Sequence, residues 1–332
     1  MTALALPLPV RSAWRRWRPG AAAWTTLGVF LLFAVLVPRF ASSGNLVNVL
    51  RVAAILCVAA CGQAIVLVLG GIEFSFGSSA ALASVVGVLA VPWLGPAGGL
   101  AAGGAVVIAI GALNGALIAG FGLPPFVVTL GMLMAAAGAA ASLVGGQPID
   151  APPSAAFAWP AAGSVATIPV PILLGAAAVT VLHALLSRSR LGRLWYLAGA
   201  NPVAARLSGI AVGRVTFLGY LVAGAFCAVT AVVLTSRVGS GQPNLAPNLP
   251  FESIAACAIG GIPLAGGEGR AHQVVCGVLV IAMMNNAVVL LNFPIAAQQL
   301  VMAVVIIGAV LLQNAGSLPV MLRRALTRRP NA

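Results

Sequence analysis

The sequence predicts an all-α, polytopic membrane protein, and three of its properties lead to that prediction. Hydrophobic residues make up 61% of the 332 residues and charged residues only 6%, whereas a soluble domain has about 25% charged residues. The mean hydropathy is +1.10. Apolar runs that match the roughly 20 residues of a spanning helix follow one another along most of the chain. No water-soluble fold could bury this much apolar sequence, so we expect the chain to lie in a bilayer.

The apolar runs predict about ten transmembrane helices. We place them at residues 21–38, 47–70, 76–92, 97–119, 124–144, 168–187, 215–236, 250–265, 271–291 and 297–313. Together they form one permease domain over residues 21–315, flanked by basic segments at 1–20 and 316–332. Gly260, Gly261 and Pro263 allow the span 250–265 to be a broken or half-length helix. Because further spans follow the first, we interpret it as an uncleaved span rather than a signal peptide.

The arginines predict the orientation of these spans. All 17 basic residues are Arg, clustered beside apolar runs, so they indicate topology rather than nucleic-acid binding. Ten spans place both termini on one side of the membrane. If that side is the cytoplasm, the loop 188–214 lies inside and the polar segment 145–167 outside. Only Arg39, Arg51 and Arg237 are then outside, and the other fourteen of the 17 are inside. This excess satisfies the positive-inside rule.

Residues 70–78 (GGIEFSFGS) place a carboxylate, Glu73, between two apolar runs. A charged side chain at the centre of a bilayer costs about 2.5–3.5 kcal/mol. Gly70 and Gly71 allow the backbone to break there, which lets Glu73 face a cavity. Two interpretations stay open. The segment is either a translocation-pathway or gating element, or a loop at the cytoplasmic membrane edge with Glu73 solvated.

A second stretch combines Asn114 and Gly115 with residues 123–131 (LPPFVVTLG). Asn114 lies near the end of a predicted span and requires hydrogen-bond partners. Pro124 and Pro125 suit the start of a helix, where a missing N–H costs nothing. The alternative to a functional role is an ordinary turn between spans.

Residues 197–210 (LAGANPVAARLSGI) predict a short capped helix in the longest cytoplasmic loop. Asn201 is a good N-cap, Pro202 suits the first helical position, and Gly209 is a good terminator. A helix of about two turns is not stable alone, so it should dock either on helix ends of its own protein or on a partner protein. The side chains that it presents are Ala204, Ala205 and Leu207.

Residues 260–270 (GGIPLAGGEGR) are rich in glycine, as phosphate-binding loops are. The chain contains no Lys, however, so a Walker A sequence is impossible. We interpret the stretch as a flexible turn with Glu268 and Arg270 at the cytoplasmic surface. Its Gly-Gly-Ile repeats that of residues 70–72, which is suggestive of an internal repeat. The two His are isolated, and we interpret the five Cys as packing residues. We therefore predict no catalytic residues, metal site or cofactor.

The order and spacing of these four stretches resemble the permease subunits of bacterial ATP-binding-cassette importers for ribose and other simple sugars. The family pattern GGI-D-x-S-x-GS is matched by residues 70–78, with Glu in place of Asp. NG followed by PF-x-x-TLG is matched at 114–131, G-x-N-x-x-AA-R-x-SGI at 199–210, and paired glycines ending in GR at 260–270. The resemblance covers about residues 45–315. Ala137, Pro263 and Glu268 depart from the family pattern, which leaves the particular sugar open.

This resemblance implies a multi-pass subunit of the bacterial inner membrane that is not itself an enzyme. Two ATPase subunits on separate chains would dock on the 199–210 helix, a periplasmic solute-binding protein would deliver the sugar, and a second permease subunit would complete a homo- or heterodimer. The residues expected for ATPase coupling are Gly199, Asn201, Ala204, Ala205, Arg206 and Gly209. Those expected in the translocation pathway are Glu73, Phe74, Ser75, Asn114, Phe126 and Thr129.

The expected function is therefore import of a monosaccharide of the ribose or xylose type. One alternative is a related permease for branched-chain amino acids or another small polar solute. Another is an ion-coupled secondary transporter, in which Glu73 would bind the coupling ion.

Overall fold

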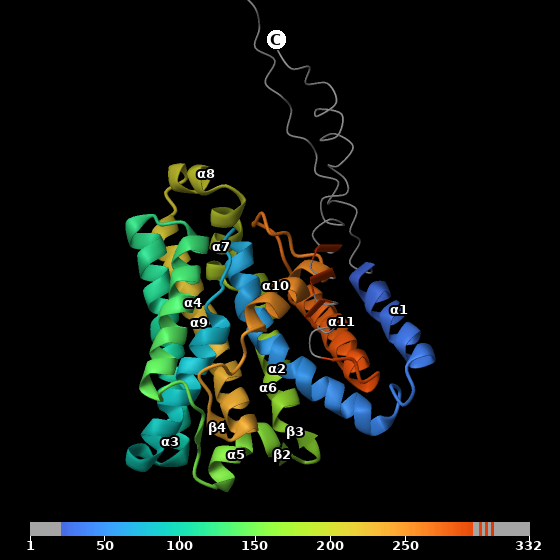
Figure 1. Ribbon diagram of the computed structural model, residues 1–332. Helices are drawn as coiled ribbons and strands as arrows, with labels where there is room; N and C mark the ends of the chain where they lie inside the picture. Colours follow the sequence, from blue (N-terminus) through green and yellow to red (C-terminus); the bar gives the residue numbers. More distant parts are fainter. Residues whose placement is uncertain (1–20, 295–298, 301–302, 305–306, 309–332) are drawn as a thin grey trace, which may run out of the picture.

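The computed structural model describes residues 21–294, 299–300, 303–304 and 307–308, which form an almost entirely helical protein (Figure 1). The helices are α1 (Ala21–Leu36), α2 (Ser43–Val68), α3 (Phe76–Phe121), α4 (Pro125–Leu143), α5 (Ala155–Ala162), α6 (Val170–Arg188), α7 (Arg190–Ala200), α8 (Pro202–Leu207), α9 (Val212–Val238), α10 (Leu249–Ile259) and α11 (Ala271–Leu290). Two antiparallel pairs of two-residue strands accompany them in the described part of the chain: β1 (Ile149–Asp150) with β4 (Ser240–Gly241), and β2 (Ser164–Val165) with β3 (Ile168–Pro169). The predicted fold class, a helical polytopic membrane protein, is confirmed.

Within the described residues, six helices are long and apolar enough to cross a membrane, namely α2, α3, α4, α6, α9 and α11. The helices α1 and α10 are apolar but shorter. Each of the first nine predicted spans contains a helix, whereas the tenth, 297–313, lies mostly outside the described residues. The total of ten spans therefore stays a prediction.

The 46-residue helix α3 consists of two legs. Its backbone leaves the helical conformation at Gly95 (φ 72°, ψ 173°), between Pro92 and Pro96, because proline removes a helix donor and clashes with the preceding turn. The legs then pack against each other, so that a Cβ on Gly99 would lie 2.5 Å from the carbonyl oxygen of Gly87. The predicted spans 76–92 and 97–119 correspond to these two legs.

Helix α10 is the half-length helix that the sequence allowed. Its 11 residues reach about 16 Å at 1.5 Å per residue, about half of the 30 Å hydrocarbon core. Gly261 ends it in the left-handed conformation (φ 92°). The N–H of Gly261 donates to Ala258 (2.9 Å) and that of Ile262 to Cys257 (2.9 Å), which is a Schellman motif.

Helix α2 ends in the same way. Gly70 has φ 78°, its N–H donates to Leu67 (2.8 Å), and the N–H of Gly71 donates to Val66 (3.0 Å). The two Gly-Gly-Ile stretches thus each end a helix with this motif, but with an offset of one residue, because Gly70 matches Gly261.

Glycines allow α3 and α9 to approach each other closely. A Cβ on Gly111 would lie 2.9 Å from Gly224 Cα and 2.8 Å from the carbonyl oxygen of Tyr220. This contact holds together the two helices that flank the site described below.

We expect Gly111→Ala to lower the free energy of unfolding by about 1–3 kcal/mol, because the added methyl group forces the two helices apart. Gly138→Ala on α4 is the matched control, since nothing lies within 4 Å of its Cβ position and alanine is the better helix former. Thermal unfolding in detergent compares the two variants. Equal losses of stability would contradict the close approach at Gly111.

Helices α7 and α8 lie at one end of the bundle, and α5 and the strands β2 and β3 at the opposite end (Figure 1). The predicted alternation, with segments 145–167 and 188–214 on opposite sides, agrees with this arrangement. Exposed arginines gather at the α7–α8 end, and they are Arg188, Arg190, Arg193, Arg206, Arg214 and Arg270. The sequence predicts a loop with one short helix over residues 188–214. The structure adds α7, which precedes α8 directly.

Candidate translocation and coupling site

Residues 69–75 leave the end of α2 and run without helical structure to the start of α3, carrying Glu73 with them. Glu73 is 2% exposed, so the interpretation of a solvated loop at the membrane edge is wrong. One carboxylate oxygen, Oε1, accepts hydrogen bonds from the Ser75 backbone N–H (2.7 Å) and hydroxyl (2.6 Å). The other, Oε2, accepts from Asn114 Nδ2 (3.0 Å). A buried carboxylate requires such donors, because it has lost its water.

Asn114 joins this cluster from the second leg of α3, 41 residues further along the chain. Its Nδ2 also donates to Ser75 Oγ (3.2 Å). On the other side, the Gln63 amide, with its oxygen and nitrogen oriented for hydrogen bonding, pairs with the backbone N–H and C=O of Glu73 at 3.3 and 3.1 Å. Glu73 is therefore held through its side chain by α3 and through its backbone by α2.

Two buried polar atoms beside this cluster have no hydrogen-bond partner among the described residues, Asn114 Oδ1 and the Tyr220 hydroxyl. Tyr220 is 1% exposed, and a Cβ on Gly71 would lie 2.5 Å from its hydroxyl oxygen. Buried polar atoms are normally satisfied. These two oxygens therefore offer acceptor and donor capacity next to the 71–75 segment.

Aromatic side chains form the accessible side of the same segment. Phe74 meets Phe126 of α4 edge-on, with ring centroids 5.5 Å apart, and lies 5.9 Å from Phe251 of α10. Phe126 is 52% and Phe251 45% exposed. Thr129 is buried and donates to the carbonyl oxygen of Ile72 (3.1 Å). All six residues that the sequence placed in a pathway thus gather around residues 72–75, the polar ones buried and the aromatic ones partly exposed.

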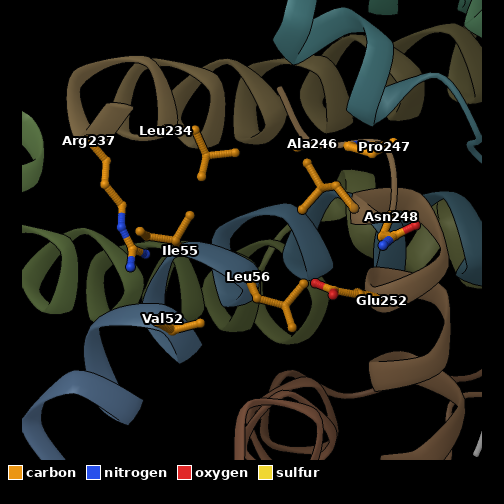
Figure 2. A pocket seen from close by; sticks show the side chains of 10 residues that line it. Val52, Ile55, Leu56, Leu234, Arg237, Ala246, Pro247, Asn248 and Glu252 are labelled. Carbon is orange, nitrogen blue, oxygen red and sulfur yellow. The ribbon is translucent and has the colours of Figure 1, made fainter. Parts of the chain in front are cut away.

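A pocket of about 250 Å³ lies between α2, the end of α9 and the start of α10 (Figure 2). Figure 2 shows the Arg237 guanidinium on one side of the pocket and the Glu252 carboxylate on the other, with Ile55 and Leu56 between them. Asn285 Nδ2 of α11 donates to Glu252 Oε1 (3.2 Å). Apart from Arg237, Asn248 and Glu252 the wall is apolar, formed by Val52, Ile55, Leu56, Leu234, Ala246, Pro247 and Leu249.

The capped helix predicted at residues 202–209 is present as α8. The Asn201 side chain accepts from the N–H groups of Val203 (3.1 Å) and Ala204 (2.9 Å), and Gly209 follows the helix with φ 80°. Its exposed apolar side chains are Val203 (62%) and Leu207 (86%).

The other residues expected for coupling do not share one surface. Ala204 and Arg206 are exposed, whereas Ala205 is 5% exposed and packs within its own chain. Gly199 lies on α7, where a Cβ would overlap the carbonyl oxygen of Val68. Glu268 and Arg270 are exposed, as predicted for the glycine-rich turn.

Four residues of the site were not predicted from the sequence: Gln63, Tyr220, Arg237 and Glu252. Glu252 carried a usable signal, because the chain has only four acidic residues and this one lies within a predicted span, where a carboxylate marks a functional site by default. Gln63 and Tyr220 had none, since one polar side chain in a long apolar helix does not identify its partners.

Comparison with known proteins agrees with these features. The model of the family "Branched-chain amino acid transport system / permease component" matches residues 45–310. The ribose import permease protein RbsC of Escherichia coli K12 is 31% identical over 296 residues, covering 87% of this chain and 91% of the relative. RbsC of Bacillus subtilis 168 is 34% identical over 293 residues, with the same two coverages.

The L-arabinose transport system permease protein AraH of E. coli K12 is 30% identical over 300 residues, or 87% of this chain and 90% of the relative. No solved structure matches the chain. The family match extends over most of the chain and includes all four glycine-containing stretches. The chain therefore belongs to the branched-chain amino acid transport system permease family, as a multi-pass permease component of an ATP-binding-cassette transporter of the bacterial inner membrane and not as a catalytic subunit.

Proposed function

We propose that this chain is the membrane subunit through which an ATP-binding-cassette importer moves a monosaccharide of the ribose or xylose type into the cell. The observation that carries the proposal is the first turn of α10, where consecutive residues Phe251 and Glu252 belong to the aromatic cluster and to the pocket of Figure 2. A sugar has apolar C–H faces, which pack on aromatic rings, and hydroxyl groups, which bind planar polar side chains. This site offers both kinds of contact.

The pocket provides complementary groups for neighbouring hydroxyls. The Glu252 carboxylate accepts hydrogen bonds, the Arg237 guanidinium donates them, and Asn248 can do both. Its volume of about 250 Å³ is close to the lower end of small-molecule sites, about 300 Å³. We propose that the sugar passes these residues on its way to the segment 71–75.

The proposed assembly follows from surfaces that this chain leaves open. The ATPase subunits dock on α8, whose side chains Val203 and Leu207 are exposed. A solute-binding protein delivers the sugar on the opposite, periplasmic side, near α5 and β4. A second permease subunit covers an apolar face of α4, where Phe126, Val127 and Met134 are exposed. In this arrangement ten spans cross the membrane and both termini lie in the cytoplasm.

A second candidate substrate is a branched-chain amino acid. It is favoured by the opposite charges of Arg237 and Glu252 across the pocket, which suit a carboxylate and an ammonium group. Ion-coupled transport fits less well, because both oxygens of Glu73 already accept hydrogen bonds from Ser75 and Asn114.

A ligand screen of the cognate solute-binding protein tests the substrate class. We expect thermal stabilisation by a pentose or related monosaccharide, because a ligand that binds only the folded state raises the melting temperature. Leucine, isoleucine and valine serve as the comparison set. Stabilisation by those amino acids with no response to sugars would replace the sugar proposal by the second candidate.

A further inference from the structure

Three glycine-containing stretches, far apart in the sequence, meet at the end of α2. They are Val68 to Gly71, Gly199 and Ala200 at the end of α7, and Gly266 and Gly267 in the turn between α10 and α11. This place connects the helices proposed to face the ATPase with the segment that carries Glu73.

The three stretches touch through their backbones. The Gly267 N–H donates to the carbonyl oxygen of Val68 (2.8 Å). A Cβ on Gly199 would overlap that same oxygen and lie 3.0 Å from the Gly267 nitrogen. A Cβ on Gly266 would lie 2.7 Å from Gly70 Cα. Because no side chain could be inserted, the contact is closer and stiffer than side-chain packing allows.

Side chains of α7 also form hydrogen bonds to the turn between α10 and α11 and to α9. The Tyr196 hydroxyl donates to the carbonyl oxygen of Gly269 (2.5 Å). Burial raises the pKa of Tyr196 although nearby Arg270 opposes the shift, so the hydroxyl keeps its proton and remains a donor at neutral pH. Trp195, 0% exposed, donates to the carbonyl oxygen of Val215 on α9 (3.1 Å). Helix α7, which α8 follows directly, is therefore fixed to the turn and to α9.

We infer that the contact of Val68 and Gly70 with Gly199, Gly266 and Gly267, here called the glycine junction, is the rigid link by which movement of α7 and α8 reaches Glu73. Val68 is the last residue of α2 and Glu73 follows five residues later. A displacement of α7 must therefore move either the end of α2 or the 260–270 turn, and coupling between sites travels through such packed contacts. The inference rests on the proposed function, because it requires an ATPase on α8.

The experiment measures sugar uptake and ATP hydrolysis together, in proteoliposomes that contain this permease with its ATPase and receive sugar-loaded binding protein. In Gly199→Ala, the methyl group separates α7 from Val68. We expect hydrolysis to stay within about twofold of wild type while uptake falls at least about tenfold, a loss within the range of coupling energies between sites. Tyr196→Phe removes only the hydroxyl tie, and we expect the ATP used per sugar to rise about threefold to fivefold.

Gly192→Ala is the matched control. It lies on the same helix, and its Cβ would overlap a backbone oxygen as well, that of Leu185 in the last turn of α6 rather than one at the junction. We expect less assembled complex from this variant but an unchanged ratio of ATP to sugar. The inference is overturned if Gly199→Ala leaves the ratio of ATP hydrolysed to sugar transported unchanged, whether both rates stay at the wild-type level or fall in parallel. If Gly199→Ala does not assemble, an unchanged ratio in Tyr196→Phe overturns it. A wild-type complex without ATP-dependent uptake refutes the proposed function instead.

Discussion

Replacing Leu207 by glutamate should remove the ATPase from the purified complex while the permease itself folds normally. Leu207 is 86% exposed and its neighbour on α8, Val203, 62% exposed, so a charge at Leu207 costs the fold little. In an interface the same charge would be buried without a partner. Truncating a hot-spot residue at the centre of an interface costs about 2 kcal/mol or more, and an unpaired buried charge costs further free energy. We expect at least about a thirtyfold loss of ATPase affinity, measured by co-purification and titration of the ATPase.

Two further variants make this result interpretable. His183→Glu places a charge at an exposed position of α6, five residues before that helix ends at Arg188, and should leave ATPase binding unchanged. Ala205→Glu is unsuitable as a test of docking, because Ala205 is 5% exposed and the charge would disrupt the packing of α8 on its own chain. Full ATPase binding and uptake by Leu207→Glu would show that α8 is not the docking helix.

Asn114→Leu should strongly impair transport and destabilise the protein. The Asn114 amide donates to Glu73 Oε2 and to Ser75 Oγ. Leucine has nearly the same size but no donor, so a buried carboxylate oxygen loses its partner. The loss of a hydrogen bond to a charged group costs about 1.5–3 kcal/mol, and releases the 71–75 segment from α3. We expect a lower unfolding temperature and an uptake rate at least about tenfold below wild type, which corresponds to about 1.4 kcal/mol.

A double-mutant cycle separates this contact from the general cost of changing Asn114. In a Glu73→Leu background no carboxylate remains to be stranded, so Asn114→Leu should cost at least about 1 kcal/mol less there than in wild type. Equal costs in both backgrounds would show that the Glu73–Asn114 contact contributes nothing. Glu73→Gln keeps the shape of the side chain and should retain more uptake than Glu73→Leu.

Local signals explain what the sequence could predict. Asn201, Pro202 and Gly209 determine α8 by capping and termination chemistry that acts within one or two turns. Pro92 and Pro96 separate the two legs of α3 for the same kind of reason. The apolar length of the spans gave the fold class, since a bilayer imposes it on every helix alike.

Helix α7, which was not predicted, could also have been predicted from the sequence. Leu191, Leu194, Trp195 and Ala198 follow the i, i+3, i+4, i+7 pattern of an amphipathic helix. The arginines on either side of this pattern are also typical of a cytoplasmic loop, which favours the prediction of a loop over that of a helix. Its apolar face is buried in the structure, with Trp195 at 0% exposure.

The burial of Glu73 could not be predicted from its neighbours in the sequence alone. Its burial depends on Asn114, 41 residues away, and on Gln63 of the preceding helix. A similar limit applies to Ala205, which the motif placed on the presented face together with Ala204 and Leu207, whereas the packing of α8 buries Ala205 and exposes Val203. Both cases require tertiary contacts that periodicity does not encode.

In the proposed mechanism this chain transports a small solute with energy that arrives from an ATPase on another chain. The most direct measurement is uptake of a labelled pentose by proteoliposomes that hold the complete complex, with sugar-loaded binding protein on one side and ATP on the other. We predict uptake only when ATP, the ATPase and the binding protein are all present, and none when a proton or sodium gradient replaces ATP. Uptake driven by an ion gradient without ATP would show that the energy does not come from an ATPase.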